Sequence, residues 1–170
     1  MTPRVKRITG ILFPSENHAL LAWSIERLSE IWGVPELQSK PVPFDKTDYY
    51  HDIDPKLSRV FLCFPGMLNP EGLTEWKHQA IEIEAMSRKP VRAVNIDPGY
   101  VDGARLVLAS TKDHAHRIYL RDGIFAEVTM RYRFKKWQSF DYTFPDFASG
   151  VYDEFLSCVR RLWLIEAKNV

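Results

Sequence analysis

The pair Asp122-Gly123 constrains the fold of this chain more than any other feature of its sequence. It separates two runs rich in β-branched and aromatic residues, 118–120 and 124–130. An Asp-Gly pair between two such runs is the strongest short-range signal for a β-hairpin. The sequence therefore predicts a hairpin at this point.

The loop of this hairpin decides which side chains share a face, because opposed residues on paired strands point the same way. A two-residue loop would mix charge into both faces. A three-residue loop that ends in a left-handed Gly123 with a bulge gathers one apolar face, made of Ile118, Leu120, Ile124, Ala126, Val128 and Met130. This register opposes Arg117 to Glu127 and Tyr119 to Phe125. We predict this register, in which the face away from the core carries Arg117, Tyr119, Glu127, Thr129 and Arg131.

Strand and helix signals alternate upstream of the hairpin. One helix is predicted to begin at Ser15 and to end at Gly33, and a second to begin at Asn69-Pro70 and to end before Pro90. Strands are predicted at 8–13, 40–44, 59–64 and 91–97, and the two prolines in 40–44 suit only a sheet edge. This order is that of an α/β (α+β) fold with a ferredoxin-like βαββαβ core. A related open sheet with another strand order would leave a similar pattern.

The remainder of the chain is predicted to extend this core by the C-terminal hairpin and a terminal helix. Asp102 is expected to cap a short helix through Ser110, ahead of the hairpin. The last helix starts at Ser149, and its apolar stripe is Tyr152, Phe155, Val159 and Leu162. No internal repeat, low-complexity tract or linker interrupts the sequence, so residues 1–170 are predicted to form a single domain.

The composition excludes some partners and compartments. A formal net charge of +1 gives no global field to recruit nucleic acid or an anionic membrane, although a local basic run lies at Arg131, Arg133, Lys135 and Lys136. No apolar run approaches the roughly 20 residues that span a bilayer, and the N-terminus lacks the apolar core of a signal peptide. Cys63 and Cys158 have no partner at metal-ligand spacing, so both are expected to be reduced and buried in a cytoplasmic protein.

The polar residues between 94 and 129 include several that suit an anionic ligand. Ser110, Thr111 and Lys112 supply two hydroxyls and an ammonium, and the guanidinium of Arg117 matches phosphate or carboxylate oxygens. The alternative is that Lys112 and Arg117 form surface ion pairs with Asp113 and Glu127. No GxxxxGK[ST] loop and no GxGxxG motif is present, which excludes the usual nucleotide-binding loops.

The same stretch supplies groups for acid-base or metal chemistry. Asn95 and Asp97 point to one face of a strand that ends at a Pro-Gly turn, and a carboxylate there could bind a divalent metal or act as a base. His116 could shuttle a proton or ligate a metal with Asp97 and Glu127, which makes these three the candidate catalytic residues. The alternatives are a turn-capping Asp97 and a structural His116. Asp45 and Asp48 form a second candidate site, against the simpler reading of an Asx turn.

Several strings in the chain resemble an uncharacterised bacterial family, the domain of unknown function 4416 family. They are PFDKTDYY (43–50), VNIDPGY (94–100), LASTKDHAHRIYL (108–120), DGIFAEVT (122–129) and YTFPDF (142–147). The resemblance covers nearly the whole chain and implies that the family pattern includes Asp97, Pro98, Gly99, Tyr100, Ser110, Thr111, Lys112, His116, Arg117, Tyr119, Glu127 and Thr129. His114 stands where the pattern has an aromatic residue, which argues against a paired metal site of His114 and His116. The family implies no reaction.

Three functions remain open on this basis. The first is a small cytoplasmic enzyme or binding protein for a phosphate-bearing ligand, a nucleotide or nucleic acid, at Asp97, Lys112, His116, Arg117 and Glu127. The second is a non-catalytic RNA-binding module that uses Tyr119, Phe125 and the basic run. The third is a protein-interaction module whose polar stretch stabilises the fold. Only the first two functions require an anionic partner. The first also requires that its five site residues lie close together in the folded protein.

Overall fold

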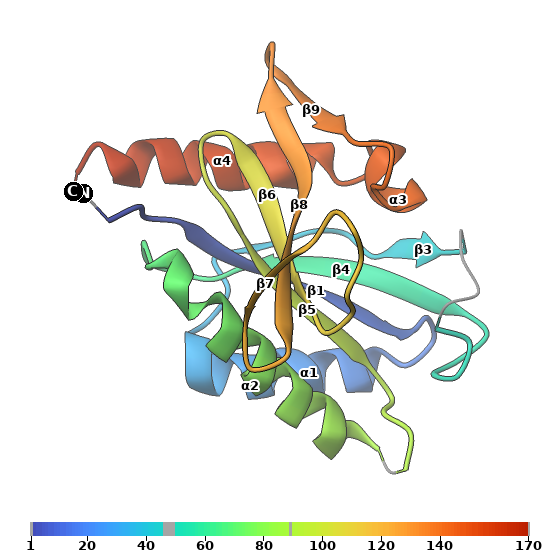
Figure 1. Cartoon of the computed structure of the whole chain (residues 1–170). Helices are drawn as coiled ribbons and strands as arrows, with labels where there is room; N and C mark the ends of the chain where they lie inside the picture. Colours follow the sequence, from blue (N-terminus) through green and yellow to red (C-terminus); the bar gives the residue numbers. More distant parts are fainter. Residues whose placement is uncertain (1, 46–49, 89, 170) are drawn as a thin grey trace.

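A single antiparallel sheet runs through the whole molecule (Figure 1). The computed structural model describes residues 2–45, 50–88 and 90–169, and within them the sheet has nine strands. The strand order is β2-β4-β1-β5-β6-β8-β7, with β3 also on β4 and β9 also on β8. The chain thus has the mixed α+β fold that its sequence predicts.

The elements follow the chain in this order: β1 (Lys6–Pro14), α1 (His18–Trp32), β2 (Leu37–Gln38), β3 (Val42–Phe44), β4 (Leu57–Cys63), the 3₁₀ helix η1 (Pro70–Gly72), α2 (Leu73–Ser87), β5 (Asn95–Val101), β6 (Arg105–Ser110), β7 (Ile118–Arg121), β8 (Ile124–Arg133), β9 (Lys136–Ser139), α3 (Pro145–Ala148) and α4 (Asp153–Ala167). Both predicted upstream helices are present. The first is capped by Asn17, whose side chain accepts a hydrogen bond from the Leu20 amide, and not by Ser15.

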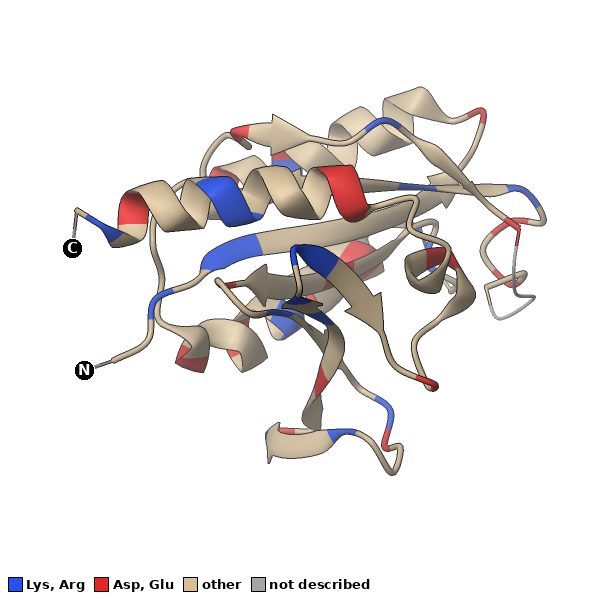
Figure 2. Ribbon diagram, turned by 90° about the horizontal axis from the view of Figure 1, so that it is seen from above, with Lys and Arg blue, Asp and Glu red and all other residues tan. Residues whose placement is uncertain are grey.

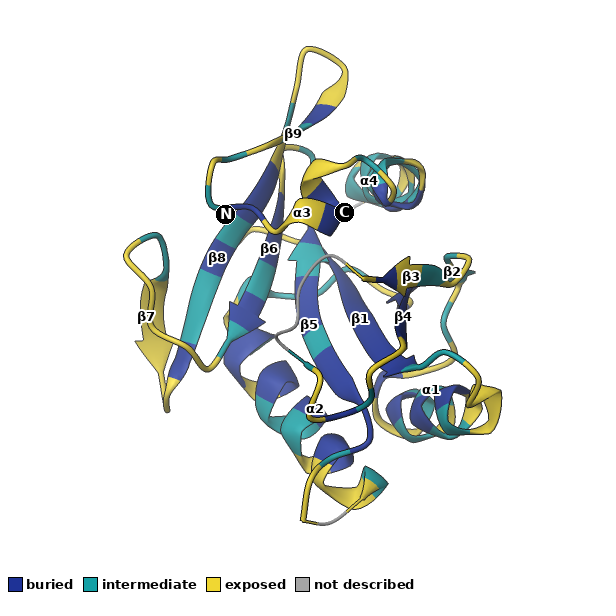
Figure 3. Cartoon of the chain, turned by 90° about the vertical axis from the view of Figure 1, so that its right-hand side faces the viewer, coloured by how far each residue is buried: buried dark blue, intermediate teal, exposed yellow. Residues whose placement is uncertain are grey.

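Helices cover both faces of the sheet (Figure 3). On one face α1 and α2 bury an apolar cluster that includes Leu28, Trp76 and Ile96. On the other face α3 and α4 bury a second cluster around Phe61 and Tyr152. Cationic and acidic residues are interspersed along the ribbon (Figure 2). None of the helices in the described residues is both long and apolar enough to cross a membrane.

The predicted helix from Asp102 to Ser110 is wrong, because Arg105–Ser110 is strand β6 and the residues before it form a turn. Oδ1 of Asp102 accepts hydrogen bonds from the amides of Ala104, at 2.7 Å, and Arg105, at 2.9 Å. These bonds close a tight turn that pairs β6 with β5. Asp102 therefore caps a turn and not a helix, a competing role that Asp side chains share with helix capping.

The β7–β8 hairpin forms with the predicted pairing but a shorter loop. Tyr119 opposes Phe125, as predicted, yet Arg121 opposes Ile124, so only Asp122 and Gly123 form the turn. Both turn residues have positive φ angles, 52° and 77°, which is typical of a type I′ turn. A register shift between Tyr119 and Arg121 absorbs the extra residue.

The predicted apolar face of this hairpin is only partly correct. Ile118 is 69% exposed, because β7 is the edge strand and no helix covers it. The pairing of β6 with β8 shifts register between Leu106 and Val107, which turns β8 over along its length. Met130 therefore belongs to the cluster under α3 and α4, whereas Ile124 belongs to the cluster under α1 and α2. The opposite face is not solvent-facing as predicted, since Glu127 and Thr129 are buried in it.

Strands β5 and β6 separate part of the way along the sheet. They pair only from Gly99 to Val101, opposite Leu108 to Leu106. Beyond this point β5 stays on β1 and β6 stays on β8. The last pair is unusually close, because a Cβ on Gly99 would lie 2.2 Å from the carbonyl oxygen of Val107. The two strands therefore form a fork, and Asp97 and Ser110 stand on its two arms.

Candidate functional site

The fork between β5 and β6 holds two adjoining cavities. The larger cavity has a volume of about 150 Å³ and the smaller one about 50 Å³. Both are lined by Tyr50, Asp97, Ser110, Arg117 and Phe144. The larger cavity also has polar walls from Lys77, Glu84, Arg92, Asn95, Thr111, Lys112 and His114, and the smaller one from Arg59, Glu127 and Thr129.

Asp97 lies between the two cavities. Its Oδ1 accepts a hydrogen bond from Nζ of Lys77 at 3.1 Å, and its Oδ2 accepts one from Nδ2 of Asn95 at 2.6 Å. The guanidinium of Arg59 is 3.8 Å from the same Oδ2. Burial by itself would raise the pKa of Asp97, but the charges of Lys77 and Arg59 and the two hydrogen bonds outweigh it and lower the pKa. Asp97 is therefore ionised at neutral pH.

Lys77 reaches Asp97 from helix α2, on the other face of the sheet. It also donates to the carbonyl oxygen of Ile96 at 3.0 Å, a group that the fork leaves without a β6 partner. Sequence reasoning missed this residue. The signal was present, because Lys77 and Glu84 are two helical turns apart on the stripe that carries Trp76 and Ala80.

Glu84 holds the far wall of the larger cavity. It accepts hydrogen bonds from the Ile96 amide at 2.8 Å and from Nη1 of Arg92 at 2.7 Å. Burial raises the pKa of Glu84, and the charges of Lys77 and Arg92 only partly offset that rise. Sequence reasoning did not identify Glu84 or Arg92 either.

Arg117 is fixed on the opposite arm of the fork by hydrogen bonds to Glu127 and Ser110. Its Nε donates to Oε2 of Glu127 at 2.8 Å. Its Nη1 donates to the Ser110 hydroxyl and to the Lys112 carbonyl oxygen, both at 3.0 Å. Because three bonds hold it and its side chain is only 9% exposed, the guanidinium presents a fixed positive charge to both cavities.

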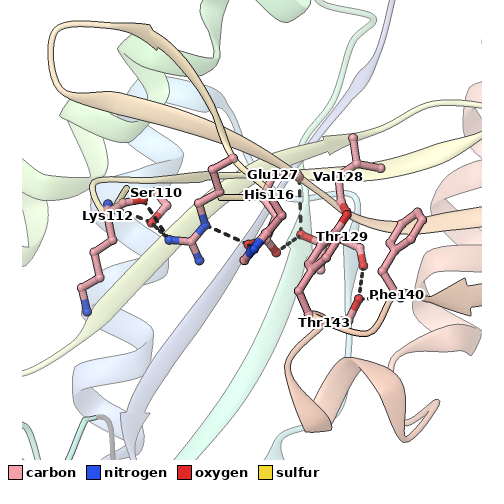
Figure 4. A network of polar contacts seen from close by, with 10 residues as sticks. Ser110, Lys112, His116, Glu127, Val128, Thr129, Phe140 and Thr143 are labelled. Atoms are coloured by element: carbon pink, nitrogen blue, oxygen red, sulfur yellow. Dashed lines mark hydrogen bonds and ion pairs between the residues drawn. The ribbon is translucent and has the colours of Figure 1, made fainter. Parts of the chain in front are cut away.

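Glu127 is the centre of the network behind Arg117 (Figure 4). Besides Arg117, its Oε2 lies 2.9 Å from Nε2 of His116, and its Oε1 accepts from the Thr129 hydroxyl at 3.0 Å. The Thr143 hydroxyl in turn donates to the Thr129 carbonyl oxygen at 2.8 Å. The network thus ties the loop before β7 and the connection before α3 to β8.

A buried ion pair lies at the smaller cavity. Arg59 is paired with Asp146 of α3, and the hydroxyl of Tyr152 donates to Oδ2 of Asp146 at 2.9 Å. Burial would lower the pKa of Arg59, but Asp146 and other negative groups raise it overall. Within the described residues, Nε of Arg59 and Oδ1 of Asp146 have no hydrogen-bond partner. None of these three residues was predicted from the sequence to lie at the site.

Most of the predicted site residues are brought together at the fork. Asn95, Asp97, Ser110, Thr111, Lys112, Arg117, Glu127 and Thr129 line one cavity or both. His116 contacts Glu127 but lines neither cavity, whereas His114 lines the larger one.

Three predicted residues lie elsewhere. Tyr100 is three residues beyond Asp97, so it points to the opposite face and packs against the cluster under α1 and α2. Tyr119 is exposed on the edge strand, with its ring against Phe125. Asp45 is exposed after β3 and lines neither cavity, and Asp48 lies outside the described residues.

The predicted metal chemistry finds no ready ligand set in the part of the chain that the structure describes. No group of three or more His, Cys, Asp and Glu side chains there is placed to hold a metal ion. Asp97 and Glu127 instead bind cationic side chains.

The fold and the fork define a mixed α+β protein with two charged cavities in an antiparallel sheet. The chain belongs to the family described as Domain of unknown function (DUF4416), whose family model matches residues 3–163. This confirms the resemblance of its sequence motifs. No curated protein and no solved structure matches the chain.

Proposed function

We propose that the protein binds a phosphate-bearing ligand with its phosphate group in the larger cavity. The observation that carries the proposal is the fixed guanidinium of Arg117, held by Glu127 and Ser110 against the cavity wall. Among the described residues no hydrogen bond engages Nη2 of this guanidinium, which can therefore donate to a phosphate oxygen. Orienting the guanidinium in advance lowers the entropy cost of binding.

The charge of the larger cavity supports an anionic ligand. Four cationic side chains line it, Lys77, Arg92, Lys112 and Arg117, against two carboxylates, Glu84 and Asp97. Glu127, which pairs with Arg117 behind the wall, reduces the excess to one positive charge, the sign that an anionic phosphate group requires. The hydroxyls of Ser110 and Thr111 add neutral hydrogen-bond groups on the same wall.

The volume of the larger cavity supports a phosphate group and not a whole cofactor. At about 30 Å³ per water molecule, 150 Å³ corresponds to about five waters. Pockets for complete drug-sized ligands are about 300–1,000 Å³. The phosphate end of a ligand would therefore fill the cavity, and the remainder would lie outside it.

In an enzyme, the carboxylates beside the phosphate would carry the chemistry. Asp97 stands at the cavity wall as an ionised group that could position water, and Glu127 with His116 lies directly behind Arg117. We propose binding as the function, and catalysis by Asp97, His116 and Glu127 as its extension. A divalent metal would enter with the phosphate, so binding should be stronger with Mg²⁺ than with EDTA if the metal takes part.

The test is a thermal-shift screen of phosphorylated metabolites and nucleotides, with Mg²⁺ or with EDTA. A ligand at 100 times its Kd stabilises the folded state by about 2.7 kcal/mol, which for this chain length raises Tm by about 5–10 °C. No shift with any phosphate compound, up to millimolar concentration, would refute the proposal.

Variants localise the binding to the fork. Lys112→Ala removes an exposed cation at the larger cavity and is expected to weaken binding about tenfold. Arg121→Ala is the matched control, because Arg121 is an exposed cation on β7 that pairs with Asp122 and lines neither cavity. Equal affinity of the two variants would place the ligand elsewhere.

The β8–β9 hairpin favours a second candidate, a non-catalytic nucleic-acid-binding module. Phe134 at its tip is 74% exposed and is flanked by Arg133, Lys135 and Lys136. Tyr119 and Phe125 do not extend this surface, because the eight residues from Phe125 to Arg133 span about 26 Å of β8. A filter-binding assay would test it: RNA affinity that falls with salt and is lost in Phe134→Ala supports this candidate.

We also propose that the first part of the chain is a ferredoxin-like unit and that the protein works in the cytoplasm. Two features support the ferredoxin-like unit: the strand order β4-β1-β5, with β2 and β3 at its outer edge, and the placement of α1 and α2 on one face.

The free thiols of Cys63 and Cys158 support the cytoplasm as the compartment. A solved structure and fractionation of producing cells, respectively, would test them.

A further inference from the structure

Four aromatic rings form a continuous stack beside the cavities. The rings of His114 and His116 are 5.7 Å apart and inclined by 20°, and those of His116 and Tyr142 are 4.0 Å apart and inclined by 12°. Tyr142 then stacks on Phe140, with centroids 5.2 Å apart and an angle of 6°. The stack is anchored, because His116 bonds Glu127 and the Tyr142 hydroxyl donates to the Val128 carbonyl oxygen at 2.5 Å.

The two ends of this stack differ. At the Phe140 end, the guanidinium of Arg131 lies 5.8 Å from the ring centroid and covers it. At the other end, His114 is exposed and lines the larger cavity. Among the described residues, only His116 contributes a ring contact to His114. The outer face of His114 is thus an open stacking position at the proposed phosphate site.

We infer that the ligand is a nucleotide whose base stacks on His114 while its phosphate occupies the larger cavity; this inference rests on the proposed function. The cavity holds only the phosphate end, so the remainder of the ligand lies at its rim. A planar base there continues the existing stack, and base–aromatic stacking favours binding whatever the identity of the base. A sugar phosphate without a base has no group for this position.

A neighbouring surface offers no such position. A broader depression of about 830 Å³ shares Ile81, Glu84 and Arg92 with the larger cavity. Its remaining walls are Ala85, Arg88 and Pro90, so the described part of this depression presents no aromatic ring. The rings at the cavity come instead from His114, Tyr50 and Phe144, which favours a ligand with an aromatic part on that side.

The test compares adenosine 5′-monophosphate with ribose 5-phosphate by isothermal titration calorimetry. The wild-type chain is expected to bind the nucleotide on the order of tenfold more tightly, the ratio that one stacked base supplies. His114→Ala is expected to lower the affinity for the nucleotide more than the affinity for ribose 5-phosphate, and so to abolish this ratio. His114→Phe keeps a ring and should keep the ratio. Phe134→Ala removes an exposed ring that lines neither cavity and should not alter the ratio.

The outcomes separate this inference from the function on which it rests. Equal affinities of the wild-type chain for the two compounds, or a ratio that survives in His114→Ala, would overturn the stacking position and leave phosphate binding intact. If ribose 5-phosphate, the nucleotide and inorganic phosphate all fail to bind, the proposed function fails and the inference with it. Retained binding of ribose 5-phosphate by His114→Ala also shows that this variant is folded.

Discussion

Arg117 and Glu127 form an ion pair of 2.8 Å between the loop before β7 and strand β8, and both side chains are largely buried. The same carboxylate serves His116 and Thr129, so its loss would leave a buried guanidinium without its counter-charge.

We therefore predict that Glu127→Gln lowers the free energy of unfolding by about 3 kcal/mol, the cost of removing one partner of a buried pair. The double variant Arg117→Met, Glu127→Gln should cost less than the sum of the two single changes, because no charge is then left unpaired. Urea unfolding of the four chains completes a double-mutant cycle. Additive costs would mean that the pair is not coupled. Phosphate binding should be lost in the double variant, which lacks the guanidinium.

Asp97 gives a prediction about pH. Its pKa is lowered in the folded protein, so its contribution to stability is present above the unfolded-state pKa of about 3.9 and is lost as pH falls through the lower folded value. Asp97→Asn should cost about 3 kcal/mol between pH 5 and 8, because Lys77 and Arg59 lose their shared partner.

This difference from wild type should shrink progressively below about pH 4, as measured by urea unfolding across a pH series. Asp113→Asn is the control, since Asp113 is exposed near the same cavity. A difference that stays constant down to pH 2 would contradict the assigned ion pairs.

Gly99 fixes the point where β5 and β6 separate. A Cβ at this position would lie 2.2 Å from the Val107 carbonyl oxygen and 2.7 Å from Cδ2 of Leu108. The Val107 carbonyl group cannot move away without breaking the last β5–β6 pair. Gly99→Ala should therefore lower the free energy of unfolding by about 3 kcal/mol.

Gly123→Ala is the matched comparison for Gly99→Ala. No atom lies within 4 Å of the Cβ that this change adds. The substitution should therefore lower the free energy of unfolding only through the positive φ of 77°, by about 1 kcal/mol. Chemical denaturation of both variants measures the difference. A Gly99→Ala chain as stable as Gly123→Ala would mean that the close approach at the fork does not exist.

The two cysteines should differ in reactivity. Burial, more than the nearby Glu36 and Glu166, raises the pKa of Cys63 to about 12, so its thiol should be inert to a disulfide reagent at pH 8 until the protein unfolds. Cys158 is only half-buried on α4 and should react in the native state, which corrects the expectation that both are buried. Two rapidly reacting thiols in the native wild-type protein would contradict this prediction. One rapidly reacting thiol in native Cys158→Ser would contradict it as well.

Much of the fold follows from local patterns in the sequence. The apolar stripes placed α1, α2 and α4, and the Asp122-Gly123 pair placed the β7–β8 hairpin with Tyr119 opposite Phe125. These features depend on side-chain period and turn chemistry, which act over a few residues. Prediction from local patterns fails where one residue suits two structures. Asp102 could cap a helix or a turn, and in the structure it caps the turn before β6.

The sequence by itself also determined one arm of the site. Arg117 precedes β7 and Glu127 lies on β8, so the register of the β7–β8 hairpin suffices to bring these two together, whereas Ser110 reaches Arg117 from β6. His116 joined them as a contact of Glu127, because it is next to Arg117 in the chain.

Only the tertiary structure decided the other arm. Lys77 of α2 and Arg59 of β4 contact Asp97 because β5 leaves β6 at Gly99 and opens the sheet between its two helical layers. Asp146 of α3 joins them through its ion pair with Arg59. Strand divergence depends on long-range pairing of β5 with β1 and of β6 with β8, which no local pattern encodes. A charged residue on the buried stripe of a helix, such as Lys77, is the sign of such a site in the sequence. Burying a charge is so costly that the structure must supply an opposite charge to pair with it.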